Sequence, residues 1–309
     1  MTRRYWPLIL TLASLWGASY FLIKVGVDGG FSPSALMASR ALLAALVLIG
    51  YLSTTIGLAA ATREIRAAWR ACVVLGTINA AVPFWLVAWG ETRIDSGIAA
   101  IAQATVPLFS LLIGLQFLPQ EHIGRLRVAG VGLGIVGVAL IAGVAPAGNV
   151  GEVIGTFAVI LASLFYASAG IYGQLRLSGT TSGPVLATGN MLAAGLILLP
   201  FAILQHPTSM PTTGALGSLV LLAVLPTALA QLILFRTIAL FGARRLSLVT
   251  YLMPGIALFY GAVLLGEQVT VAAVAGLVLI LLGVALGSGT LRPGRRSAEP
   301  PAAGPQDER

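Results

Sequence analysis

Long apolar runs separated by short polar gaps make up most of the chain. A run of about 17–25 apolar residues is long enough to cross the hydrocarbon core of a bilayer as an α-helix. This pattern predicts an all-α polytopic membrane protein with ten transmembrane helices. The first run imitates the core of a signal peptide, but many similar runs follow, so we expect it to be retained. The runs are Pro7–Val27, Ser34–Leu52, Trp69–Trp89, Gly97–Phe117, Leu126–Val144, Val153–Gly173, Val185–Leu204, Leu216–Thr237, Ser247–Leu265 and Val271–Ser288.

Composition supports a membrane protein and excludes several other classes. Hydrophobic residues make up 58% of the chain and charged residues 9%, and the mean hydropathy is +0.96. A soluble domain has about 25% charged residues. The net charge of +8 comes mostly from arginines between the apolar runs, so we expect no nucleic-acid partner. A single cysteine, Cys72, and two histidines, His122 and His206, provide no disulfide framework or metal cluster, and no cofactor is expected.

The positions of the arginines predict how the chain is oriented. Cytoplasmic loops of membrane proteins carry an excess of Lys and Arg. With the N-terminus inside, the outer side or outer helix ends receive only Lys24, Arg40 and Arg93. Both termini are therefore predicted to be cytoplasmic, and residues 290–309 have the composition of a disordered cytoplasmic tail. The inner side receives Arg3, Arg4, Arg63, Arg66, Arg70, Arg125, Arg127, Arg176, Arg236, Arg244, Arg245 and the tail arginines.

The two halves of the chain carry matching features. The sequence LASLWGAS at Leu12–Ser19 matches LASLFYAS at Leu161–Ser168. Each half has five predicted spans, an odd number, so the second copy must lie upside down relative to the first. We predict one repeat over residues 1–146 and another over 147–289, the layout of many secondary transporters, with the site near mid-membrane between the halves. Pro107, Glu121, Gly130 and Gly137 also recur in order as Pro254, Glu267, Gly276 and Gly283.

Prolines inside three predicted helices point to a polar site. A helical proline frees the carbonyl four residues earlier. A free carbonyl beside a polar side chain is costly in hydrocarbon unless it faces a cavity or another helix. Two alternatives stay open: the kinks are purely structural, or Thr250 caps its own freed carbonyl. The predicted helix breaks are Pro83, Pro107 and Pro254, and the polar residues four positions earlier, which we predict to bind substrate, are Asn79, Gln103 and Thr250.

Aromatic residues near the middle of several spans are the second group of candidates. Trp and Tyr normally lie at the bilayer interface. Trp16 and Phe165 occupy equivalent positions in the two repeats, which suggests an aromatic wall from both halves. Such a wall suits the apolar part of a ligand, and packing in the core is the alternative. The candidates are Trp16, Tyr20, Phe84, Tyr166 and Tyr251, with Gln231 as a further hydrogen-bonding residue.

Charged residues are expected at the ends of the spans. Glu91, Asp95, Glu121, Glu152 and Glu267 all lie there, and no acid lies in the middle of a span. Proton-coupled pumps usually need a buried carboxylate or histidine, so the sequence favours a facilitator or exchanger over a proton pump. Arg40, about two turns into the second span, is expected to snorkel to the outer face. The alternative is that it pairs with Glu91 or Asp95 as an outer gate.

Glycine spacing in the fifth and tenth spans predicts close helix packing. Gly132, Gly134 and Gly137 match a dinucleotide fingerprint, but they lie in an apolar helix with no preceding strand, which excludes that interpretation. Small residues let helix backbones approach closely in membranes. The same interpretation applies to Gly283 and Gly287.

The chain resembles the EamA branch of the drug/metabolite transporter superfamily. The resemblance rests on Trp16–Lys24, the run Asn79–Ser110 and the helix-ending acids Glu121 and Glu267, and it covers nearly the whole chain to Ser288. It implies two inverted five-helix repeats around a central cavity, lined mainly by helices 1, 3, 4, 6, 8 and 9, and a multi-pass protein of the bacterial inner membrane. One departure is PQE at 119–121, where the second half keeps the family's usual LGE at 265–267.

We therefore predict a transporter that moves a small metabolite by alternating access, with no catalytic residues. The resemblance makes amino-acid export the leading substrate class. A multidrug or cation exporter is the alternative, but it would need a buried carboxylate in the first helix, which this chain lacks. A membrane-embedded enzyme would need a catalytic cluster, which the sequence does not offer. The expected partners are the small-molecule substrate and the lipid bilayer, with the protein acting as a monomer or homodimer.

Overall fold

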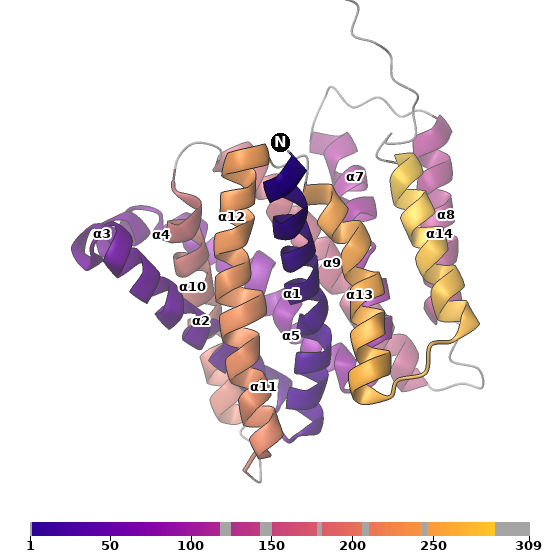
Figure 1. The fold of residues 1–309 in the computed structure, drawn as a ribbon, viewed down its shortest axis with the longest axis horizontal. Coiled ribbons are helices and arrows are strands. Elements are labelled where there is room, and N and C mark those ends of the chain that lie inside the picture. The colour runs from indigo at the N-terminus through magenta and orange to yellow at the C-terminus, as the bar shows by residue number, and fades with distance from the viewer. Residues whose placement is uncertain are drawn as a thin grey trace, which may run out of the picture.

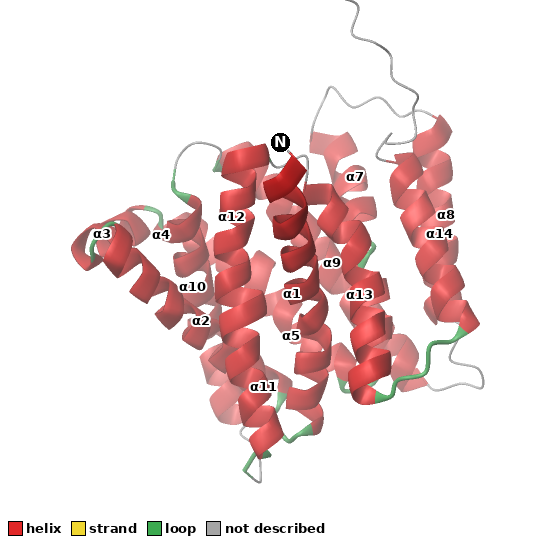
Figure 2. Cartoon of the chain, viewed as in Figure 1, coloured by secondary structure: helices red, strands yellow, loops and turns green. Residues whose placement is uncertain are grey.

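A computed structural model describes residues 2–117, 125–142, 150–177, 181–205, 210–242 and 246–287. Within these ranges the regular structure is helical, as Figure 2 shows. Glu121, the PQE sequence at 119–121 and the tail over 290–309 lie outside the described residues. The elements of the first half are α1 (Thr2–Asp28), α2 (Pro33–Thr55), α3 (Leu58–Ala67), α4 (Trp69–Leu75), η1 (Gly76–Ala81), α5 (Val82–Glu91), α6 (Ser96–Gln103), α7 (Val106–Phe117) and α8 (Arg125–Ala142). Those of the second half are α9 (Val150–Arg176), α10 (Gly183–Leu204), α11 (Thr213–Ala223), η2 (Val224–Leu229), α12 (Ala230–Phe241), α13 (Ser247–Leu265) and α14 (Val271–Gly287).

The all-α polytopic architecture predicted from the apolar runs is confirmed. Within the described residues, eight helical stretches are long and apolar enough to cross a membrane. The fifth and tenth predicted spans correspond to the shorter apolar helices Val128–Ile141 and Val271–Gly287, so a count of ten spans is not established. Large apolar side chains such as Leu46, Ile135 and Phe259 face outward and are 61–63% exposed, as expected for a surface in contact with lipid.

Figure 1 shows α1 running from one end of the helical bundle to the other. We call the end of the bundle where α1 begins the near end, and the end where α1 finishes at Asp28 the far end. Lys24 near the end of α1 bonds the carbonyl of Glu91 at the end of α5. Glu152, in the first turn of α9, lines the same far-end cleft as Lys24. Because α1 finishes where α9 begins, the two helices run in opposite directions.

Glycines let several helix pairs approach closely. A Cβ atom built on Gly130 of α8 would lie 2.5 Å from the carbonyl oxygen of Gly283 in α14, and one built on Gly283 would lie 2.5 Å from that of Gly130. Gly137 and Gly276 face each other in the same way about two turns along the two helices. The predicted packing role of the glycines in these two helices is therefore confirmed, although Gly132 of the same segment faces open space.

Three spans are interrupted in their interior. In the third span, the π-helix η1 directly precedes Pro83. In the fourth, α6 ends at Gln103 and α7 begins at Val106, next to Pro107. A second π-helix, η2, contains Pro226 and interrupts the span formed by α11 and α12. The predicted helix break at Pro254 is not found, because α13 continues across this residue as one helix.

The short helix α3 was not predicted. It connects α2 to α4 and is amphipathic, with Ala61 buried and the arginines Arg63 and Arg66 exposed. Ala61 packs in a small apolar cluster with Leu52 and Val185. The helix therefore attaches to the near end of the bundle through one face and presents its charged face outward.

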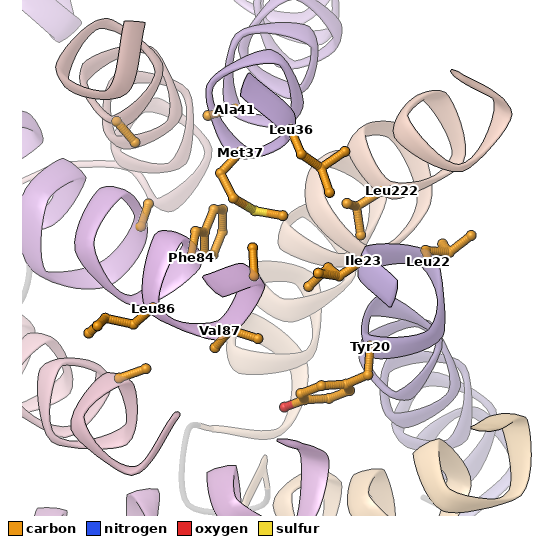
Figure 3. Close-up of a cluster of buried hydrophobic side chains, with 14 of the residues drawn as sticks. Tyr20, Leu22, Ile23, Leu36, Met37, Ala41, Phe84, Leu86, Val87 and Leu222 are labelled. Atoms are coloured by element: carbon orange, nitrogen blue, oxygen red, sulfur yellow. The ribbon is translucent and has the colours of Figure 1, made fainter. Parts of the chain in front are cut away.

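The largest apolar cluster lies between the helices of both halves. It contains buried side chains from α1, α2, α5, α6, α9, α10 and α11. Figure 3 shows Met37 of α2 beside Phe84 of α5, with Tyr20 extending from α1 into the same interior. The polar residues described next lie within and beside this cluster.

Candidate functional site

A group of polar side chains is enclosed in the interior of the bundle. Glu91 is 0% exposed, Thr227 is 2%, Tyr20 is 4% and Arg40 is 5%. Gln103 and Tyr166 belong to the same group and are half-buried. The group therefore combines residues of the first half, on α1, α2, α5 and α6, with residues of the second half, on α9 and η2. We call these six residues the central polar cluster.

Four side chains in or beside the cluster lie at a similar depth in the bundle, measured from the far end. Tyr20, Arg40, Phe84 and Gln103 each lie about two helical turns, or about 11 Å, from the far end of their own helix. Helix direction therefore explains how residues far apart in sequence meet, because α1 and α5 finish at the far end while α2 and α6 begin there.

Arg40 is the charged centre of the cluster. Its Nε donates to the Thr227 hydroxyl at 2.8 Å, and its guanidinium carbon lies 4.0 Å above the centre of the Phe84 ring. A further guanidinium nitrogen, Nη1, lies 3.7 Å from the Met37 sulfur. The expectation that Arg40 snorkels to the outer face is wrong, because the surrounding helices bury the whole side chain. The electrostatic neighbours of Arg40 are Tyr20, Glu91 and Tyr166.

Glu91 lies at the end of α5, as predicted, but its side chain is turned inward and buried. Within the described chain, neither of its carboxylate oxygens has a hydrogen-bond partner. Lys24 binds the backbone carbonyl of Glu91 at 2.9 Å and the Asp28 carboxylate at 3.4 Å instead. The inference that no acid is available in the interior therefore has to be corrected.

Gln103 and Tyr166 connect the two halves of the cluster. The Gln103 side chain is a neighbour of Tyr166 across the two halves. The Gln103 Oε1 atom is buried and has no partner among the described residues. With the two oxygens of Glu91, the central polar cluster therefore has three buried acceptor atoms without a partner among the described residues. Unused buried acceptors are rare in proteins and call for an explanation.

The remaining predicted site residues lie outside the central polar cluster. Phe84 forms the apolar surface beneath Arg40. Trp16 packs between two apolar clusters beside α13, and Tyr251 packs against a different cluster built by α6, α7, α8 and α14. Asn79 in η1, Gln231 in the first turn of α12 and Thr250 in α13 are half-buried.

A cleft of about 650 Å³ opens at the far end above the cluster. It is lined by Lys24, Asp28, Asp95 and Glu267, among others. Partial burial and the nearby Glu267 carboxylate raise the pKa of Asp95 above its ordinary value, although Lys24 opposes this shift. No group of three or more His, Cys, Asp or Glu side chains in the described ranges is arranged to hold a metal ion.

Glu267 joins the two halves at this cleft. Its carboxylate accepts the backbone N–H groups of Ser96 at 2.7 Å and Gly97 at 2.9 Å, at the first turn of α6. Gly266 ends α13 with a φ of +69°, and the N–H of Glu267 bonds the carbonyl of Gly261. The left-handed conformation at Gly266 therefore aims the carboxylate at the other repeat, where it suits the positive end of a helix.

A second cleft, of about 800 Å³, lies at the near end. Trp69 and Arg70 line it from the start of α4, and Tyr172 and Arg176 line it from the end of α9. The clefts thus flank the central polar cluster at opposite ends of the bundle. Neither lining includes a residue of the central polar cluster.

Comparisons with known proteins agree with this architecture. Residues 5–143 and 153–289 each match the EamA-like transporter family. A protein of Streptantibioticus cattleyicolor described as a "probable terminal-alkyne amino-acid exporter" is 28% identical over 303 residues, covering 97% of this chain and 98% of the relative. The uncharacterized inner membrane transporter YedA of Escherichia coli K12 is 26% identical, covering 85% of this chain and 83% of the relative. A crystal structure that is 20% identical covers 92% of this chain and 96% of its own with a TM-score of 0.65, which shows a shared fold.

Proposed function

Because this chain belongs to the EamA-like transporter family of the drug/metabolite transporter superfamily, we propose that it exports amino acids across the bacterial inner membrane by alternating access. The observation that carries this proposal is the central polar cluster, in which Arg40 of the first half bonds Thr227 of the second inside an apolar bundle. Buried charges within membrane proteins mark substrate pathways. The protein acts as a monomer or homodimer.

The proposed movement is a rocking of the repeats over 1–146 and 147–289 about this cluster. The opposite directions of α1 and α9 support an inverted relation between them. Interrupted helices near mid-membrane are typical of transporter binding sites, and here they occur at η1, at the α6–α7 break and at η2. We further propose that Asn79, Gln231 and Thr250 line the pathway during this movement.

An amino acid suits the cluster better than an organic cation does. The buried Glu91 carboxylate by itself would accept a cation, but a cation would leave the buried Arg40 without a counter-ion. The acid on α1, Asp28, is exposed at the far end instead of lying in the interior. The relative described as a terminal-alkyne amino-acid exporter supports the same substrate class. An apolar side chain on the substrate would contact Tyr20 and Phe84.

The near end is proposed to face the cytoplasm. Its exposed arginines include Arg63, Arg66, Arg70 and Arg176, and such residues favour the cytoplasmic side. In a Cys72→Ser background, an impermeant maleimide applied to intact cells should label Thr92→Cys at the far end. Arg63→Cys should react only after permeabilisation. The reverse labelling pattern would contradict the orientation.

Facilitated diffusion or exchange is the proposed mode of transport. The unpartnered carboxylate of Glu91 favours proton-coupled antiport as a second candidate, because proton-coupled transporters use buried acids as relays. A pH gradient distinguishes uncoupled transport from proton-coupled antiport, since it leaves the equilibrium distribution of an uncoupled substrate unchanged.

Counterflow in proteoliposomes tests the proposal. Vesicles are loaded with one of a panel of unlabelled amino acids, nucleosides or sugars, diluted into the labelled compound, and measured with and without a pH gradient. We expect transient accumulation of an amino acid, with no requirement for the gradient. If no amino acid accumulates while another compound does, the proposed substrate is wrong; a strict requirement for the gradient favours antiport.

A further inference from the structure

We propose that Arg40 and Glu91 bind the two charges of an amino-acid zwitterion: the guanidinium holds the substrate carboxylate, and the Glu91 carboxylate holds the substrate ammonium group. This inference rests on the proposed function, because it specifies how the same site recognises its substrate. It assigns the substrate an orientation, with its ammonium group toward the far end.

Arg40 has unused capacity to bind an anion. A guanidinium has five N–H donors in a planar fork that matches a carboxylate. Among the residues that the structure describes, the Nε donor of Arg40 bonds the oxygen of Thr227, and Nη1 meets the weak acceptor Met37. Among the described residues, no carboxylate oxygen lies within 4.0 Å of its nitrogens. Because a buried cation without a counter-ion is costly, a substrate carboxylate would stabilise Arg40 by serving as its counter-ion.

Glu91 has the complementary capacity to bind a cation. An ammonium group carries three N–H donors and no acceptor. Both carboxylate oxygens of Glu91 and the Oε1 atom of Gln103 are buried acceptors without partners in the described chain. Lys24, the nearest alternative cation, already binds the Glu91 backbone carbonyl and Asp28. The Glu91 carboxylate thus has no hydrogen-bond partner among the described residues, and a substrate ammonium group would provide one.

Arg40 and Glu91 form no direct ion pair with each other. The two side chains nevertheless interact electrostatically. A zwitterion bridging them would form charge-assisted hydrogen bonds of about 2.8 Å at each end. A substrate with one charge would leave either the buried cation or the buried anion unpaired. Recognition of both charges would therefore exclude amines and carboxylic acids of the same size.

The test uses three probes that share one side chain: L-leucine, leucine methyl ester, which lacks the carboxylate, and N-acetyl-leucine, which lacks the ammonium group. Each probe is measured as a competitor of labelled leucine. If another amino acid gives the strongest counterflow, that amino acid and its own methyl ester and N-acetyl derivative take the place of the leucine set. In the wild-type protein we expect each derivative to compete at least about tenfold more weakly than the amino acid.

Two substitutions then assign each charge to its residue. Arg40→Gln should weaken leucine binding at least about tenfold but leave the methyl ester unchanged, and Glu91→Gln should weaken leucine but leave N-acetyl-leucine unchanged. Arg236→Gln, an exposed arginine on α12, serves as the control and should change none of the three affinities. Because the wild-type comparison needs no variant, loss of folding in either variant does not prevent the test.

The possible failures are distinguishable. If the wild-type protein exchanges an amino acid but binds the ester and the N-acetyl derivative equally well, the zwitterion site is wrong and the proposed function stands. Equal weakening of all three probes by Arg40→Gln and Glu91→Gln would also overturn it. If the wild-type protein exchanges no amino acid, the proposed function and this inference fail together.

Discussion

Replacing Gly261 with alanine tests how the two halves are joined at the far end. Gly261 lies in α13 against the carboxylate that caps α6. A Cβ atom at this position would lie 2.2 Å from the Oε2 atom of Glu267 and 3.0 Å from the Ser96 hydroxyl. Since the methyl group and the carboxylate cannot share this space, the substitution should displace Glu267 from the N–H groups of Ser96 and Gly97.

The expected loss follows from the contacts that would be broken. Loss of a helix N-cap costs about 0.5–2 kcal/mol, and a carboxylate at a helix N-terminus contributes a further 0.3–1 kcal/mol or so. Replacing glycine by alanine inside a helix returns about 1 kcal/mol. We therefore expect Gly261→Ala to destabilise the protein by about 1 kcal/mol, which lowers Tm by roughly 2–4 °C.

Thermal unfolding of the purified protein in detergent measures this change. Gly255→Ala is the matched control, because it lies on the same helix with nothing within 4 Å of the added atom, so it should not lower Tm. In a Glu267→Ala background the cap is already absent, and Gly261→Ala should then be neutral or stabilising. The reasoning is refuted if Gly261→Ala matches Gly255→Ala, or if its effect persists without Glu267.

Three further predictions concern other contacts. Gly130→Ala should lower Tm, because the added atom would lie 2.5 Å from a carbonyl of α14, whereas Gly132→Ala on the same helix faces open space and should not. Thr227→Val removes the buried acceptor of Arg40 and should cost about 1–3 kcal/mol in a denaturant titration, while Thr227→Ser, which keeps the hydroxyl, should restore most of it. Asp95→Asn should raise Tm at pH 7, because an acid with a raised folded-state pKa destabilises the folded protein when ionised. The gain in Tm should shrink as the pH falls toward 3.8, the ordinary pKa of the group. A gain in Tm that grows at lower pH would contradict a destabilising charge at Asp95.

The fold could be predicted because the constraints on it are local. A membrane span needs an apolar run of sufficient length, and the helical spans follow these runs closely. The interruptions before Pro83 and at Pro107 also follow from local chemistry, since proline removes a helical donor. The π-helix at Pro226 is not predicted from the sequence, although a proline lies inside that span as well. The helix α3 is not predicted either, because its apolar face is short.

The site was predicted only in part because burial depends on the packing of other helices. The sequence indicates Tyr20, Gln103 and Tyr166 because they are polar or aromatic residues inside spans, and the structure places them in the central polar cluster. Their role in binding stays a prediction. Glu91 was set aside because it lies at a helix end, and nothing in its neighbourhood along the chain shows that the side chain turns inward. Thr227, the partner of Arg40, is distant in sequence, and nothing in the sequence around Thr227 indicates that it bonds an arginine.

Photo-crosslinking with a diazirine analogue of leucine tests most directly whether one substrate site is shared by both halves. The analogue is irradiated in proteoliposomes with and without excess leucine, and the labelled peptides are mapped by mass spectrometry. We predict leucine-protected labels on peptides of both halves, near Arg40 or Phe84 in the first and near Tyr166 or Thr227 in the second. Labels confined to one half, or found only at the near-end cleft around Trp69 and Arg176, would contradict a shared central site.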